Sequence, residues 1–446
     1  MRAAAHNPWA ARFAPLLDQE EIRRRAAVFP QPMLGLFQLP VEVAYRRLET
    51  ALQELFYPSQ QCVELLSKWV GMAYAHCLEI YSDEKAFLQH INAPEPPLPN
   101  FFFPHCFTGL PGTGKTKLLN TLHRILPPPA EIVVGSGYPP VPSQSSWAIS
   151  IDTCTAPSDL LIPFAGGKER PKNLTEICRK LAYRNGVAIF TADEFQHATT
   201  STSANAQVTK MLMSVAYLGL PYVYGANYSL VERLMRRPHE DRQRLLAHFD
   251  VLLPDPPESQ DWSNMLAAQK GIAPDIFQFD PIEDALVIHG CSAGCKRAEK
   301  HLLLAGLRIG HQRKRPVTID VLREAYSSQN YASYREEVEQ LLQVSLEAWQ
   351  HSGRKRRHRD DLKCPIDLPK ETQAMLLEQT AKLRKTQVAA KMQESAMTPA
   401  EKALLKTAER QARKKSPKLQ AIPAKRKQPL TAEELKNNSL WFKSKL

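Results

Sequence analysis

The chain has 446 residues, of which 43% are hydrophobic, and a formal net charge of +12. No stretch approaches the roughly 18 uninterrupted apolar residues that a membrane-spanning helix needs, and residues 1–30 lack the apolar segment of a secretory signal. The eight cysteines are scattered without a disulfide framework, so we expect a reduced, cytoplasmic protein of two or three structural units.

Residues 1–100 are expected to form a helical region that ends in a linker. In Pro40–Tyr57, apolar side chains recur every three or four residues with charged side chains between them, which predicts a helix. A second helix is expected from Gln60 to about Tyr81. The prolines of Asn92–Asn100 fix the backbone and remove hydrogen-bond donors, so this stretch is interpreted as the linker.

Residues 101–255 show a different pattern, in which short apolar runs alternate with helical segments. The runs are FFFPHCFTGL, EIVVGS, WAISID, VAIFTAD and PYVYGAN. This alternation predicts an α/β domain with a parallel sheet flanked by helices. Helical periodicity then resumes at 285–289, 297–307 and 319–326, which predicts a smaller helical domain over residues 256–350, called the lid below.

Residues 351–446 form a basic tail. They contain 24 Lys or Arg against 10 Asp or Glu, whereas the rest of the chain carries 34 against 36. The tail is poor in aromatic residues, and we expect it to be disordered with transient helices. Such a segment can bind nucleic acid or an acidic protein surface, or serve only as a solubilising tail.

The sequence GLPGTGKT, at Gly109–Thr116, matches the phosphate-binding loop (P-loop) pattern G-x-x-x-x-G-K-[ST]. It follows an apolar run and precedes a helical run, as a P-loop requires. Backbone N–H groups and the helix N-terminus would surround the phosphates of ATP, Lys115 would contact the β- and γ-phosphates, and the Thr116 hydroxyl would bind Mg²⁺. The residues expected to bind ATP are Gly109, Gly112, Thr113, Gly114, Lys115 and Thr116.

A second apolar run, Val187–Glu194, ends in two carboxylates. We expect Asp193 to hold Mg²⁺ and Glu194 to orient and activate the attacking water, which predicts ATP hydrolysis. The next run ends at Asn227, a position where AAA+ ATPases place a polar residue near the γ-phosphate. Gln196 is a second polar candidate, and an Asn227 that only forms a turn is the alternative.

The segment from 230 to 249 is dense in arginine. Hexameric and filamentous ATPases insert an arginine from one subunit into the site of the next, where it stabilises transition-state charge. Arg242 and Arg244 are the preferred candidates because they precede the last expected strand. A solvated helix face is the alternative. The competing residues are Arg233, Arg236 and Arg237.

Three further features are candidates for a functional role. Arg297 opens a lid helix and is expected to move toward the nucleotide when the lid closes. His289, Cys291 and Cys295 could suggest a metal site, but a single Cys-x3-Cys is not a zinc signature. A loop with three basic residues is either a contact for DNA phosphates or an ordinary surface loop. These basic residues are Lys168, Arg170 and Lys172.

The order of these motifs resembles the TnsC/TniB-type AAA+ regulators of DNA transposition. The resemblance rests on the P-loop, FTADEFQHATT, PYVYGANYSLVERLMRRPHEDRQRLL and the lid end KRPVTIDVLREAY, and it covers about Phe101 to Ser328. The P-loop is shared by all AAA+ proteins, whereas the DEFQ and lid-end motifs are more specific. Ala192 departs from the pattern, in which a bulky aliphatic residue commonly precedes the aspartate.

The resemblance implies an AAA+ P-loop NTPase that regulates transposition and is not itself a transposase. Such proteins assemble with ATP into homo-oligomeric rings or helical filaments on duplex DNA, independently of sequence. They bridge a target-selector protein and the transposase subunits, and hydrolysis drives disassembly. The alternatives are another DNA-remodelling AAA+ ATPase, of the initiator or helicase-loader type, or a nucleotide-gated DNA-binding scaffold with negligible turnover.

The end of the tail differs from the Lys-rich stretch before it. Residues 430–446 begin like a helix, and Leu440, Trp441 and Phe442 form an apolar cluster. A large aromatic residue on a flexible polar segment is a typical anchor for a partner's pocket. We therefore interpret residues 354–429 as a tether and 430–446 as a peptide that docks on the transposase. DNA binding by charge alone is the alternative.

Overall fold

The computed structural model describes residues 7–135, 137–151, 156–166, 173–193, 195 and 204–347, and the structural statements below concern these residues. Within them, no helix combines the length and apolar character that crossing a bilayer requires. The basic tail, the 168–172 loop and Glu194 lie outside the described residues.

The described part of the α/β domain contains a parallel sheet of five strands. In spatial order they are β4 (Ser146–Ser150), β5 (Ile189–Asp193), β6 (Tyr222–Asn227), β1 (His105–Gly109) and β7 (His248–Leu252). All neighbouring pairs are parallel. The chain leaves β1, crosses to β4, returns through β5 and β6, and then places β7 on the other side of β1. This reversal creates a crevice at the carboxyl ends of β1 and β6, where ligands bind in open parallel sheets.

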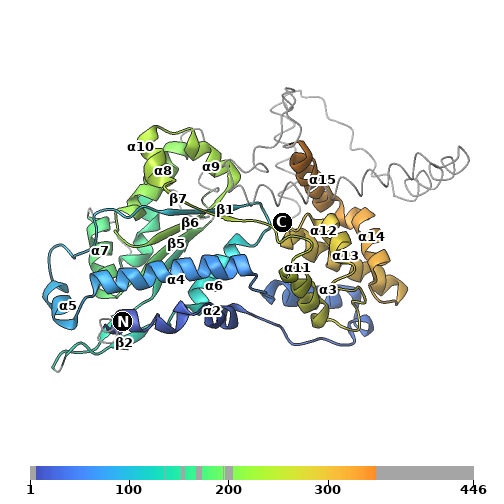
Figure 1. Cartoon of the computed structure of the whole chain (residues 1–446), viewed down its shortest axis with the longest axis horizontal. Helices are drawn as coiled ribbons and strands as arrows, with labels where there is room; N and C mark the ends of the chain where they lie inside the picture. Colours follow the sequence, from blue (N-terminus) through green and yellow to red (C-terminus); the bar gives the residue numbers. More distant parts are fainter. Residues whose placement is uncertain are drawn as a thin grey trace, which may run out of the picture. The chain divides into compact units, whose positions relative to one another are not determined.

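Helices cover both faces of this sheet, as Figure 1 shows: α4 and α6 run along one face, and α8 and α9 along the other. The helices of the α/β domain are α6 (Lys115–Ile125), α7 (Leu174–Arg184), α8 (Ala204–Ala216), α9 (Tyr228–Met235) and α10 (His239–Leu245), with the short 3-10 helices η5 (Pro157–Leu160) and η6 (Ile162–Phe164). The predicted α/β fold is confirmed. Both faces of the central strands are buried, which explains why they are nearly continuous apolar runs.

One expected strand does not belong to the main sheet. The run EIVVGS contributes β2 (Ala130–Ile132), which pairs antiparallel with β3 (Val141–Ser143) in a separate two-stranded ribbon. The assignment of this run to the parallel sheet was therefore wrong. Prolines at 127–129 precede β2 and left-handed glycines follow at 135 and 137, so the chain turns back before a longer strand can form.

The N-terminal hundred residues contain both predicted long helices, and Asn92–Asn100 is neither helix nor strand, as expected. The elements are α1 (Pro8–Ala11), η2 (Ala14–Leu17), α2 (Gln19–Ala26), η3 (Leu36–Gln38), α3 (Val41–Glu54), α4 (Gln60–Ile80) and α5 (Glu84–His90). Two separate hydrophobic cores share these elements. Helices α1, α2 and α4 pack into the core of the sheet, whereas α3 packs into the core of the lid.

The lid is helical, as predicted. Its elements are α11 (Gln260–Ile272), α12 (Ala285–Ser292), α13 (Lys296–Arg313), α14 (Ile319–Ser327), η8 (Gln329–Tyr331) and α15 (Ala332–Glu347). Buried apolar residues of α3, such as Leu48 and Leu52, belong to the same cluster as Leu303 of α13. Arg308 of α13 also pairs with Glu42 at 3.0 Å. The N-terminal segment thus supplies one helix of the lid (Figure 1).

Candidate functional site

The P-loop joins the end of β1 to the start of α6. Its glycines have backbone conformations that other residues rarely adopt, with φ of 83° at Gly112 and 105° at Gly114. At Gly109 the constraint is space, because a Cβ atom there would lie 2.5 Å from the carbonyl oxygen of Leu252. Gly112 and Gly114 are therefore required by the backbone conformation of the loop, and Gly109 by the close approach of β7.

Lys115, the first residue of α6, folds back over this loop. Its Nζ donates hydrogen bonds of 2.9 Å to the carbonyl oxygens of Gly109 and Leu110. Lys115 and Thr116 line a cavity of about 750 Å³, together with Gly112 and Gly114. The cavity is large enough for a nucleotide-sized ligand.

The carboxyl ends of the neighbouring strands bring two more predicted residues to this cavity. Asp193 ends β5 and Asn227 ends β6, and Asn227 is the register partner of Gly109. Both side chains line the cavity. A Cβ atom at Gly225 would lie 2.2 Å from Oδ1 of Asp193, so glycine at this position makes room for the carboxylate. Sequence reasoning did not identify Gly225, because its role depends on a neighbouring strand.

A partly buried histidine, His123, connects the P-loop helix to β5. Nδ1 of His123 lies 2.7 Å from Oγ of Ser146, and its Nε2 lies 2.6 Å from Oγ1 of Thr191, two residues before Asp193. Burial lowers the pKa of His123 to about 4, so the ring is neutral near pH 7. This contact holds the helix that carries Lys115 in a fixed relation to the strand that carries Asp193.

The cavity is electropositive, since five basic and two acidic side chains line it. The basic residues are Lys115, Lys117, Lys296, Arg297 and Lys300, and the acidic ones are Glu49 and Asp193. Lys117 donates to the carbonyl oxygens of Gln53 and Leu55, and burial, followed by the charges of Lys300 and Arg124, lowers its pKa to about 8. A polyanion such as the triphosphate of ATP, with Mg²⁺ at Thr116 and Asp193, fits this set of side chains.

The lid contacts the P-loop through the first turn of α13. The backbone N–H of Arg297 donates to the carbonyl oxygen of Gly112 at 3.1 Å, and its side chain lines the cavity. A Cβ atom at Gly112 would lie 3.0 Å from Cβ of Arg297, so the two segments are in close contact. The structure thus brings Arg297 together with the P-loop. Lys296 lines the same cavity but was not identified from the sequence, where it is one of many lysines.

An arginine that enters the ATP site of a neighbouring subunit is called the trans arginine below. The preferred candidates for it lie away from the cavity of their own chain. Arg242 and Arg244 are exposed on α10, which precedes the amino end of β7, whereas the P-loop follows the carboxyl end of β1. Parallel strands of five residues place about 16 Å between these edges. The guanidinium of Arg244 lies 6.0 Å from the ring centroid of Phe101.

Two competing arginines, in the turn between α9 and α10, are held in ion pairs with residues of these helices. Arg236 pairs with Glu232, and Arg237 lies 3.1 Å from Asp241. These contacts favour Arg242 and Arg244 as candidates for a contact with a second subunit, which remains a prediction.

Several predicted site residues lie outside the described residues. They are Glu194, Gln196, Lys168, Arg170, Lys172, Leu440, Trp441 and Phe442. Their roles remain predictions from the sequence.

The metal alternative at 289–295 gains no support. Among the described residues, no three His, Cys, Asp or Glu side chains form a group that could hold a metal ion. Nε2 of His289 lies 3.2 Å from the carbonyl oxygen of Asp255, and burial raises the pKa of the Cys295 thiol to about 12. These residues are part of the lid core.

No protein-family model and no curated protein sequence matches the chain. Among solved structures it is similar to the Aeropyrum pernix ORC2 protein in ADPNP–ADP complexes, with 14% identity, 63% of this chain and 74% of that chain covered, and a TM-score of 0.39. It is also similar to the Aeropyrum pernix ORC1 protein in complex with DNA, at 17% identity, 64% and 72% coverage, and a TM-score of 0.33.

A third similar structure is domain III of the Thermotoga maritima replication initiation protein DnaA. It has 15% identity, 54% and 88% coverage, and a TM-score of 0.32. The features that define the fold are present in the chain itself, namely the strand order β4-β5-β6-β1-β7, the P-loop after the central strand and the helical lid in contact with it. The chain has the fold of an AAA+ P-loop NTPase.

Proposed function

We propose that this protein binds and hydrolyses ATP with Mg²⁺, and that it uses this cycle to regulate DNA transposition while assembled on duplex DNA. The observation that carries the ATPase part of this proposal is that the P-loop, Asp193, Asn227 and the lid residue Arg297 line one cavity. Residues from four separate segments of the chain converge there, and each has the chemistry that phosphoryl transfer needs.

The described side chains would divide the work as follows. Lys115 and Arg297 would bind and orient the phosphate oxygens, while Thr116 and Asp193 would hold Mg²⁺. The bound metal would neutralise charge that develops on the phosphates. Asn227 would orient the attacking water. Glu194, the next residue after Asp193 in the sequence, would accept its proton.

The transposition part of the proposal rests on the sequence. It is supported by the DEFQ motif, by the lid-end stretch Thr318–Tyr326 and by the concentration of positive charge in residues 351–446. The coarser reading, an AAA+ ATPase that acts on DNA, requires only the fold and the basic segments. Electron microscopy with duplex DNA and a non-hydrolysable ATP analogue is expected to show rings or helical filaments. Particles that remain monomeric would contradict the assembly.

DNA binding is expected to require ATP and to be indifferent to sequence, because phosphate-seeking charges carry it. Alanine substitutions at Lys168, Arg170 and Lys172 should flatten the log–log dependence of affinity on salt by roughly 0.9 for each phosphate contact removed. The measurement is a fluorescence-anisotropy titration of labelled duplex across a salt series.

The matched control removes three exposed charges from the lid, at Arg313, Lys314 and Arg323, and is expected to leave the slope unchanged. An unchanged slope in the loop variant would exclude that loop as a DNA contact and point to the tail.

The trans arginine is expected to reveal itself by complementation. Arg242→Ala and Arg244→Ala should each be tested, and the variant that lacks the trans arginine should bind ATP normally but hydrolyse it at least about a hundredfold more slowly. The arginine variant keeps an intact ATP-binding site, and a Lys115→Ala chain still carries the arginine that this variant lacks. Mixing the two proteins should therefore restore part of the ATP turnover, measured as phosphate release.

Arg236→Ala is the matched control, because this exposed arginine, which follows the end of α9, already pairs with Glu232 of that helix. It is expected to hydrolyse ATP at the wild-type rate. If neither Arg242→Ala nor Arg244→Ala is complemented, no residue of this pair acts in trans.

A further inference from the structure

The segment that joins the α/β domain to the lid runs from Leu253 to Ser259 and is called the hinge below. It connects β7 to α11 and has the sequence LPDPPES. Its three prolines fix φ and leave few rotatable bonds, so a change in lid angle must be concentrated in a short stretch of backbone. Asp255 lies between two of these prolines and is buried.

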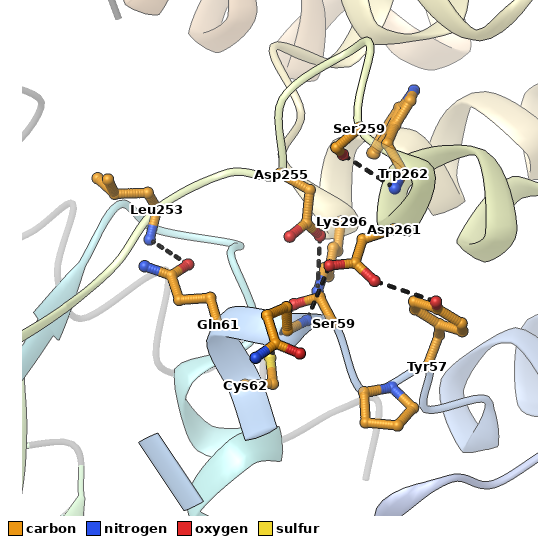
Figure 2. Close-up of polar contacts among 12 residues, drawn as sticks. Tyr57, Ser59, Gln61, Cys62, Leu253, Asp255, Ser259, Asp261, Trp262 and Lys296 are labelled. Atoms are coloured by element: carbon orange, nitrogen blue, oxygen red, sulfur yellow. Dashed lines mark hydrogen bonds and ion pairs between the residues drawn. The ribbon is translucent and has the colours of Figure 1, made fainter. Parts of the chain in front are cut away.

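Residues 57–61, which precede and begin α4, hold the hinge at both ends (Figure 2). On the side of the sheet, the amide of Gln61 donates to the carbonyl oxygen of Val251 at 3.0 Å and accepts from the N–H of Leu253 at 3.2 Å. On the side of the lid, Asp261 accepts from the Tyr57 hydroxyl at 3.0 Å and from the N–H of Gln60 at 2.8 Å.

Between these fixed ends, Asp255 contacts Lys296. Figure 2 shows the two side chains directed toward each other, and Nζ of Lys296 lies 3.2 Å from Oδ2 of Asp255. Burial alone would lower the pKa of Lys296, but it is raised because Cys62 and Asp255 lie beside the amine. The lysine is therefore charged, and this partly exposed cation pairs with the buried carboxylate of Asp255.

The same lysine also contacts the P-loop. Lys296 is the first residue of α13, next to Arg297, whose N–H donates to Gly112. A Cβ atom at Gly114 would lie 3.9 Å from Cδ of Lys296, so the stem of the lysine passes over the P-loop while its amine reaches the hinge. Lys296 also lines the cavity. One side chain thus touches both the proposed phosphate site and the hinge.

We infer that Lys296 is a positioning residue that couples ATP binding to the lid hinge through Asp255. The inference rests on the proposed ATP binding. Bound phosphates add negative charge beside the Lys296 stem and attract its ammonium and α13 toward the P-loop. Asp255 follows, since a buried carboxylate left without its cation is costly. The hinge therefore changes its conformation when the cavity fills.

This arrangement predicts effects of opposite sign for the two partners. Lys296→Met removes a cation from the cavity and should weaken ATP binding about tenfold. Asp255→Asn removes the carboxylate that competes with the phosphates for Lys296, and should strengthen ATP binding about threefold. An ion pair with only a structural role would instead make both variants weaker binders. The measurement is isothermal titration of the full-length protein with ATP and Mg²⁺.

Hydrogen exchange provides a second readout at the hinge. In wild-type protein, adding ATP should slow exchange of the amides between residues 253 and 263. In Asp255→Asn, ATP should bind without this change. Lys270→Met is the matched control, because this lid lysine donates to the carbonyl oxygen of Phe279 and is not among the cavity residues. It should keep both the ATP affinity and the hinge response of the wild type.

Either single variant leaves a charge without its partner and can lower the unfolding temperature, Lys296→Met more so because Asp255 is buried. The double variant Asp255→Asn/Lys296→Met removes both charges and should recover wild-type stability while it keeps the weak ATP binding of Lys296→Met. The inference is overturned if the double variant binds ATP like the wild type, or if Asp255→Asn binds more weakly than the wild type. Wild-type protein that binds no ATP would instead contradict the proposed function.

Discussion

Replacing Lys115 by alanine is expected to abolish ATP binding. The Lys115 amine is held by the carbonyl oxygens of Gly109 and Leu110, which fixes it above the loop that would surround the phosphates. A charge-assisted hydrogen bond contributes about 1.5–3 kcal/mol. Its loss, together with that of the main point charge, should weaken binding by at least about a hundredfold. Equilibrium titration with a fluorescent ATP analogue measures this change directly.

Lys180→Ala is a suitable control, because Lys180 is exposed on α7 and is not among the cavity residues. It is expected to bind ATP like the wild type. Lys115 also donates hydrogen bonds to carbonyl oxygens of the P-loop and can stabilise the loop in this way. The unfolding temperature of Lys115→Ala should therefore be measured as well. A folded Lys115→Ala protein with wild-type ATP affinity would exclude the P-loop as the nucleotide site.

Glu194→Gln is expected to bind ATP but to hydrolyse it about 10²–10⁴-fold more slowly, the usual cost of losing a general base. The substitution keeps the size and shape of the side chain and removes its ability to accept a proton from water. ATP-bound protein should then accumulate in its assembled form on DNA. Single-turnover hydrolysis measures the rate, and light scattering with duplex DNA measures the lifetime of the assembly.

The matched control is Glu176→Gln, at an exposed carboxylate of α7. It should hydrolyse ATP at the wild-type rate. Equal turnover by Glu194→Gln and wild-type protein would refute the assignment of the base. If the same protein also assembled and disassembled normally, a nucleotide-gated scaffold would explain the chain better than an ATPase.

Much of the fold was predictable because it depends on local order in the chain. The α3 and α4 helices begin and end within a few residues of the boundaries that apolar periodicity predicts. The P-loop was predictable for the same reason. The left-handed conformations of Gly112 and Gly114 and the helix that begins at Lys115 involve only adjacent residues.

The parallel strands were predictable as apolar runs, but their partners were not. The run EIVVGS is rich in β-branched residues, yet its first residues pair antiparallel with Val141–Ser143 instead of joining the main sheet. An apolar run indicates β-propensity but carries little information about which strand lies beside it or how deeply it is buried. Gly225 illustrates the same point, because the need for glycine arises from Asp193 on the neighbouring strand.

By itself, the sequence determined the class of fold, the P-loop and the carboxyl strand ends that carry Asp193 and Asn227, because each is encoded in a short contiguous segment. Only the tertiary structure decided that α3 belongs to the lid core, that His123 joins the P-loop helix to β5, and that Lys296 connects the P-loop to Asp255. These contacts join residues at least 41 positions apart in the sequence, the separation of Asp255 and Lys296. The burial, hydrogen bonds and charge pairing that stabilise them exist only after the chain has folded.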